Sequence, residues 1–293
     1  MPLSALLLVL AAALLHATWN IVAKHSGGDN RFSLIGSIQL VLIWAPVGLW
    51  FAWDAVPHWT WREWACVAAS GALHLTYFST LLRGYRVSDL TVVYPVARGT
   101  GPLLSATGAV LWMGERLGAL GTAGVAGVAL GVFLIAGGPG LWARAHDPAQ
   151  RARVRLGLGY GAATGALIAG YTLVDGYAVK VVLVSPILVD YFGNLLRIPF
   201  LLPLALREEG SLREAWRTQW KHALVVAVLG PLGYVSVLYA VRLAPLSHVA
   251  PAREVSMLFA ALIGGRLLGE GDRGLRLAGA VCIAAGVVSL AIG

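Results

Sequence analysis

The chain has 293 residues, of which 58% are apolar, 12% are charged and 36 are glycine, and its formal net charge is +8. A soluble domain carries about 25% charged residues, so this chain has too few charges to cover a surface in water. Its basic residues lie in connections between apolar stretches, which argues against binding to nucleic acid. We therefore expect an all-α polytopic membrane protein.

Ten apolar stretches of roughly 20 residues, the length that crosses a bilayer as a helix, follow one another along the chain. The first has no basic start and no small-residue cleavage site, so it is expected to remain as a span. Cys66 and Cys282 fall inside spans, and no Cys/His spacing indicates a metal or other cofactor. The predicted spans are 3–24, 32–53, 64–84, 88–112, 118–138, 156–180, 185–206, 221–242, 245–268 and 274–292.

The first predicted span carries a polar stripe, because His16, Asn20 and Lys24 recur every four residues and so share one helix face. Polar side chains within spans are uncommon and face a partner helix or a water-filled cavity. His16 and Asn20 are therefore candidates for hydrogen bonds to another helix or for substrate binding. Lys24 is expected to extend to the membrane interface.

Arginines occur beside prolines in the fourth and ninth predicted spans, where Arg98 follows Pro95 and Arg253 follows Pro251. Proline removes a backbone donor, and membrane helices tolerate breaks where the break lines a cavity. The pattern predicts broken helices whose arginines bind a polar substrate, with Tyr94 on the same face as Arg98. Kinks that serve packing, with structural ion pairs, are the alternative.

Further polar residues lie in the sixth, seventh and ninth predicted spans. Asp190, Asn194 and Arg197 share a helix face, and Asn194 could bridge the two charges or contact substrate. Asp175 and Glu254 are candidates for coupling transport to protons. For each acid the alternative is a carboxylate held permanently in an ion pair.

The longest connection, 139–155, contains four arginines and is predicted to be a linker between residues 1–138 and 156–293. Fifteen Lys and Arg residues lie in the connections that follow odd-numbered spans, and four lie in the others. Because positive charge stays in the cytoplasm, both termini are expected outside.

The two halves of the chain are related in sequence. Residues 97–138 match residues 252–293 at 14 positions without a gap, and this offset pairs Arg98 with Arg253. The same offset places Asn20 on Asp175. Each half holds five predicted spans, so the second half enters the membrane from the opposite side. Such inverted five-helix repeats are typical of transporters, with the substrate site at the midplane where the repeats meet.

Two other patterns predict local structure without chemistry. Glu115 and its repeat partner Glu270 each follow a glycine at the end of a span, and we expect them to cap helices or anchor loops. Gly157, Gly161 and Gly165 form a small-residue stripe, which predicts close packing on another helix.

The repeat organisation, the segment His16-Ala-Thr-Trp19-Asn20 and the stretch from Arg98 to Glu115 with its copy from Arg253 to Glu270 resemble EamA-type transporters of the drug/metabolite transporter superfamily. The resemblance implies a secondary active transporter in the plasma (bacterial inner) membrane. It implies the export of a small polar metabolite such as an amino acid or organic anion. It also implies cytoplasmic termini, opposite to the charge count.

The alternative function is an intramembrane enzyme that uses His16, Asp175 or Glu254 as acid or base. The sequence contains no nucleophile-elbow motif to support it. It also contains no Gly-Lys-Ser/Thr phosphate loop, which excludes an ATP-driven pump of that kind. The sequence thus favours a carrier of a small molecule over an enzyme.

Overall fold

The computed structural model describes residues 1–26, 29–135, 147–263 and 273–293, and within these ranges it contains helices and no strands. The all-α prediction is therefore confirmed. The helices are α1 (Leu3–His25), α2 (Asn30–Ala55), η1 (Val56–His58), α3 (Trp61–Val87), α4 (Leu90–Trp112), α5 (Ala119–Ile135), α7 (Pro148–Lys180), α8 (Pro186–Ala205), α9 (Leu212–Leu243), α10 (Leu246–Ala252), η2 (Arg253–Val255), α11 (Ser256–Ile263) and α12 (Arg273–Ile292).

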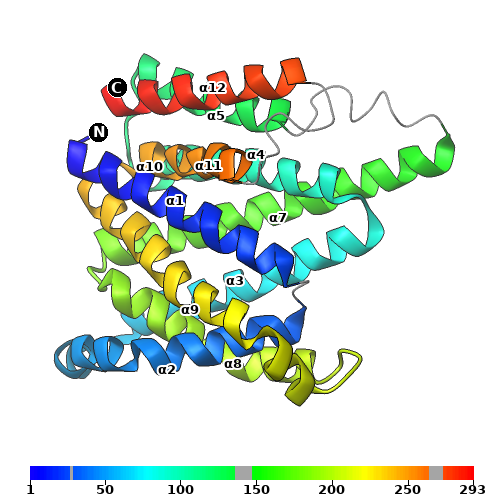
Figure 1. Cartoon of the computed structure of the whole chain (residues 1–293). Helices are drawn as coiled ribbons and strands as arrows, with labels where there is room; N and C mark the ends of the chain where they lie inside the picture. Colours follow the sequence, from blue (N-terminus) through cyan, green and yellow to red (C-terminus); the bar gives the residue numbers. More distant parts are fainter. Residues whose placement is uncertain (27–28, 136–146, 264–272) are drawn as a thin grey trace.

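The helices form a bundle with one helix pair at each edge (Figure 1). At one edge α5 packs on α12, and at the other α2 packs on α8. Between them α1 packs on α9, and α7 packs on α3. In the repeat α1 corresponds to α7 and α3 corresponds to α9, so the two contacts are equivalent, and each joins the two halves. The segments α4 and α10–α11, which carry the predicted arginines, lie side by side in the middle.

In the part of the chain that the structure describes, six helices are long and apolar enough to cross a membrane: α1, α2 with η1, α3, α8, α9 and α12. The helix α5 is apolar but shorter, at 17 residues. The other predicted spans fall in α4, in α7 and in α10–α11, which contain Arg98, Asp175 and Arg253. In the ninth predicted span the break leaves α10 and α11 only 7 and 8 residues long. The number of ten transmembrane helices therefore remains a prediction.

Two helices, α7 and α9, start eight and nine residues before their predicted spans at 156 and 221. The helix α7 begins at Pro148, inside the predicted linker, because Asp147 caps it by accepting the Gln150 amide at 2.7 Å. The helix α9 begins at Leu212, where Ser211 accepts the Arg213 amide. Residues 136–146 of the predicted linker lie outside the described residues.

The predicted helix breaks differ between the two halves. In the second half the helix is interrupted at Arg253–Val255, a 3₁₀ turn between α10 and α11, as expected. In the first half the prediction was wrong, because α4 runs without a break from Leu90 to Trp112. Its prolines, Pro95 and Pro102, are contained within the helix, since a proline costs one backbone hydrogen bond but does not by itself end a membrane helix.

The glycine stripe of α7 packs closely on α4, as predicted. A Cβ atom at Gly161 would lie 2.9 Å from the Val93 carbonyl oxygen, and one at Gly165 would lie 3.1 Å from the Ala97 carbonyl oxygen. These glycines allow the two backbones to approach each other. The contact holds α7, which carries Asp175, against α4, which carries Arg98.

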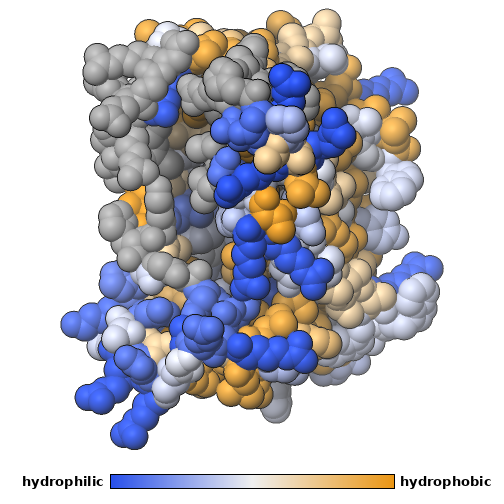
Figure 2. Space-filling model, turned by 90° about the vertical axis from the view of Figure 1, so that its right-hand side faces the viewer, coloured by the Kyte–Doolittle hydropathy of each residue, from blue (hydrophilic) through white to orange (hydrophobic). Residues whose placement is uncertain are grey.

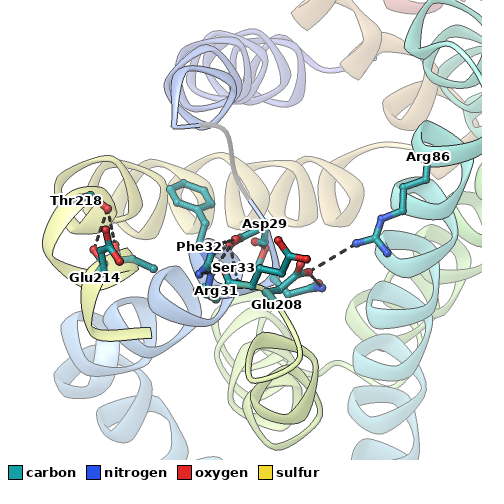
Figure 3. Close-up of polar contacts among 11 residues, drawn as sticks. Asp29, Arg31, Phe32, Ser33, Arg86, Glu208, Glu214 and Thr218 are labelled. Carbon is teal, nitrogen blue, oxygen red and sulfur yellow. Dashed lines mark hydrogen bonds and ion pairs between the residues drawn. The ribbon is translucent and has the colours of Figure 1, made fainter. Parts of the chain in front are cut away.

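The face that contains the predicted basic connections is here called the basic face. Figure 2 shows hydrophilic side chains gathered on it. Near the start of α2, Asp29 accepts the Arg31 and Phe32 amides, Arg31 pairs with Asp29, and Glu208 is 3.7 Å from Arg86 (Figure 3). Arg31 also donates to the Glu209 carbonyl, so these contacts connect α2, α3 and the α8–α9 connection. The exposed basic residues of this face are Arg83, Arg86, Arg151, Arg153, Arg155, Arg207, Arg213, Arg217 and Lys221.

Candidate functional site

Three charged residues meet where α4 lies beside the break between α10 and α11. Arg98 Nε is 2.9 Å from Glu254 Oε2, and Arg253 Nε is 3.9 Å from Glu254 Oε1. We call this group the Arg98–Glu254–Arg253 triad. The sequence predicted both arginines here, and the structure brings them to opposite oxygens of one carboxylate. Two arginines and one carboxylate leave one net positive charge at the junction of the two halves.

The triad is buried unevenly. The side chains of Glu254 and Arg253 are 1% and 5% exposed, whereas that of Arg98 is 20% exposed. Arg98 also donates to Ser256 Oγ at 3.1 Å and lies 5.9 Å from the centre of the Tyr94 ring. The predicted pairing of Tyr94 with Arg98 is thus present in the structure. Arg98 is therefore the most exposed member of the triad.

Among the described residues, the hydrogen bonds of the His16 and Asn20 side chains lie within α1. His16 Nδ1 lies 2.8 Å from the Ala12 carbonyl oxygen, and Asn20 Nδ2 donates to the His16 carbonyl at 2.6 Å. His16 packs against Gly233 of α9 and is close enough to Arg253 for electrostatic interaction. Asn20 is exposed. His16 therefore lies near the triad. The position of Asn20 neither supports nor contradicts its predicted role in substrate binding.

Asp175 is fully buried on α7. Tyr234 of α9 donates a hydrogen bond to its Oδ2 atom, and Ser70 of α3 lies beside it. Among the described residues, no cation lies within 4.0 Å of its carboxylate, and Oδ1 has no hydrogen-bond partner. Asp175, Tyr234 and Arg253 line one cavity of about 10 Å³, which is about the space that one water molecule needs.

A second polar group lies on α8. Asn194 Nδ2 donates to the Asp190 carbonyl at 2.8 Å and to its Oδ1 atom at 3.2 Å, and Arg197 Nε donates to the Gly193 carbonyl. The predicted contact of Asn194 with Asp190 is present, while Arg197 interacts with Asp190 and Asp175 only over longer distances. Asn194 is buried, and among the described residues its side chain bonds to Asp190 and not to the triad.

Sequence reasoning missed an aromatic cluster beside Asp175. The His74 ring stacks on Tyr171 at 3.9 Å and meets Tyr77 and Tyr234 edge-on. His74 is a polar residue inside an apolar helix, the signal that singled out His16.

The three candidate acid–base groups have separate partners, since Glu254 pairs with arginines, Asp175 bonds to Tyr234 and His16 bonds to a backbone carbonyl. Within the part of the chain described, no three His, Cys, Asp or Glu side chains gather as metal ligands.

Glu115 caps a helix of the other half, as predicted. Its carboxylate accepts the Leu246 and Ser247 amides, both at 2.8 Å, at the start of α10. Lys180 Nζ, at the end of α7, is 3.0 Å from Glu115 and 2.9 Å from the Ala244 carbonyl. Gly114 holds a positive φ of 67° in the turn that presents Glu115. The repeat partner Glu270 lies outside the described residues.

Comparisons with known proteins agree with this fold. The model of the EamA-like transporter family matches the chain twice, over residues 3–137 and 155–292. No curated protein matches the chain. A solved structure titled only "Crystal structure of protein" superposes with a TM-score of 0.73 over 100% of this chain and 98% of that one, at 16% identity. At that identity the likeness concerns the fold alone.

Proposed function

Because the chain belongs to the EamA-like transporter family and is an integral membrane protein, we propose that it is a secondary active transporter of a small polar metabolite. The substrate carries a carboxylate or phosphate group and is an organic anion or an amino acid. The direction is export, and the location is the plasma membrane, which is the inner membrane in bacteria. Two inverted five-helix repeats, residues 1–138 and 156–293, alternate around the site.

The observation that carries this proposal is the net-positive triad. Arg98 and Arg253 come from matching positions of the two repeats, and both face Glu254. A buried cation that is not fully balanced attracts an anion, and arginine offers planar, charge-assisted hydrogen bonds that suit carboxylate and phosphate. The partly exposed Arg98 side chain supplies the first contact, and its bonds to Ser256 and Tyr94 orient it.

Transport by proteoliposomes tests the proposal. Counterflow of labelled alanine, succinate and phosphate should identify a transported class, and Arg98→Ala or Arg253→Ala should reduce its uptake at least tenfold, about the effect of one lost charge-assisted bond. Arg217→Ala is the matched control, because Arg217 is an exposed arginine of the basic face and should leave uptake unchanged. Full transport by both triad variants would contradict the proposal.

We further propose that Asp175 carries the coupling proton. It is buried beside a water-sized cavity, has no ion pair among the described side chains and shares that cavity with Arg253 of the triad. A carboxyl group in such a place can accept and release a proton as the site changes sides. Glu254 is less suited to this role, because two arginines hold its charge.

A further inference from the structure

We propose that Glu254 limits the substrate to a single uncompensated negative charge. This inference rests on the proposed function, since it concerns what the Arg98–Glu254–Arg253 triad binds. In the triad each guanidinium faces a different oxygen of the same carboxylate. Among the described residues no other carboxylate lies within 4.0 Å of Arg98 or Arg253. The triad by itself therefore offers one unit of positive charge to a ligand.

The net charge follows from an asymmetry between the two halves. The arginines are repeat partners, but the partner of Glu254 is Gly99. A Cβ atom at Gly99 would make only ordinary contacts, 3.8 Å from Val132 Cγ1 and 3.9 Å from the Ala129 carbonyl oxygen. Helix packing thus does not by itself require glycine at position 99. The single carboxylate at 254 decides how much of the arginine charge remains.

Burial makes this difference matter for selectivity. Glu254 and Arg253 are shielded from solvent, so an ion bound there is compensated by the triad and not by water. A monoanion neutralises the site, whereas a dianion leaves one buried negative charge unbalanced, which is costly. Without the Glu254 charge the same site carries two positive charges, and the preference should turn to dianions.

Succinamate and succinate are suitable probes, because they share a carbon skeleton and differ by one negative charge. Binding to purified protein in detergent can be measured by the shift in melting temperature over a concentration series. The protein should bind succinamate at least tenfold more tightly than succinate. Glu254→Gln keeps the size of the side chain and should change this ratio at least tenfold in favour of succinate.

Two further variants make the result decisive. Glu115→Gln removes a carboxylate outside the triad and should keep the original ratio. The double variant Arg253→Gln/Glu254→Gln restores one net positive charge and should restore the preference for succinamate. It also provides a test if the single variant Glu254→Gln fails to fold. A ratio in Glu254→Gln within twofold of the original, or no binding of either probe to any of these proteins, overturns the inference. Loss of transport in Arg98→Ala together with an unchanged ratio would show that this inference fails while the proposed function holds.

Discussion

The carboxyl group of Asp175 differs from the other buried acids in its surroundings. Glu254 faces two arginines, and Asp190 accepts a bond from Asn194 on its own helix. Asp175 instead accepts a bond from the neutral hydroxyl of Tyr234. Its repeat partner is the amide Asn20, so a titratable group at this position exists in one half of the protein only.

If Asp175 carries the coupling proton, Asp175→Asn should abolish concentrative transport driven by an imposed pH gradient. The amide has nearly the same size but cannot ionise. Counterflow exchange requires no net proton movement, so it should survive. Both activities can be measured in the same proteoliposomes. Asp190→Asn is the matched control and should retain both, whereas pH-driven accumulation by Asp175→Asn would disprove the assignment.

The sequence identified those site residues whose side chains are unusual in a membrane helix. Arg98, Arg253 and Glu254 stand out because charges within spans are costly. Tyr234 and Tyr171 do not, because tyrosines in an apolar helix resemble ordinary packing residues. Tyr234 reaches Asp175 because α9 packs on α7, and His74 of α3 stacks on Tyr171 of α7. No sequence periodicity specifies these contacts between helices.

At the scale of elements, Glu115 joins three connections at the face opposite the basic face. Burial raises the pKa of Glu115, but the bonds from the Ser247 and Leu246 amides and from Lys180 together lower it below its ordinary value of 4.5. A lowered pKa in the folded state means that the carboxylate stabilises the fold above about pH 4.5. This contribution is lost as the pH falls through the lower, folded-state value.

Glu115→Gln should therefore lower stability by about 1 kcal/mol at pH 7, the usual value of a helix cap. The difference from the unmodified protein should shrink as the pH falls below 4.5 and through the lower, folded-state pKa of Glu115, and it should disappear once that carboxyl group is protonated. Melting temperatures in detergent, recorded from pH 7 downward, measure the effect. Lys180→Met removes the ion pair but not the cap, and it should cost less. A difference that persists at low pH would contradict the capping role.

The ends of the elements were harder to predict than their centres. Apolar stretches indicated the helices of the bundle, but α7 and α9 extend beyond them into polar sequence, where Asp147 and Ser211 cap the first turns. These extensions include Arg151 and Arg213, which look like parts of a loop when hydropathy alone is used. Prolines indicated the break near Arg253 and misled at Arg98, because a proline allows a break but does not impose one.

At the scale of the whole molecule, the charge asymmetry predicts that the basic face is cytoplasmic and both termini are outside. Single cysteines for an impermeant thiol reagent can be placed at Ala149 and His58, which are both exposed. His58 is preferable to Thr60, because Thr60 caps α3. Cys66 and Cys282 must first be replaced, since neither is fully buried.

In intact cells the reagent should label position 58 but not position 149. The reason is that the fifteen Lys and Arg residues in the connections after odd-numbered spans would otherwise face the exterior, against the retention of positive charge in the cytoplasm. Permeabilised cells, in which both positions should react, provide the control. Labelling at 149 and not at 58 would establish the opposite orientation, with cytoplasmic termini.

The unequal shapes of α4 and α10–α11 have a consequence for the transport cycle. In an inverted-repeat carrier the two halves are related by symmetry and alternate around one site, so we expect each half to adopt in the next state the shape that the other half holds now. The continuous helix around Arg98 should then open into a turn while the 3₁₀ turn at Arg253–Val255 closes into a helix. Overall helix content would stay constant, but the weak point would move from one half to the other. Amide hydrogen exchange recorded with and without substrate should show protection lost around Arg98 as it is gained around Arg253.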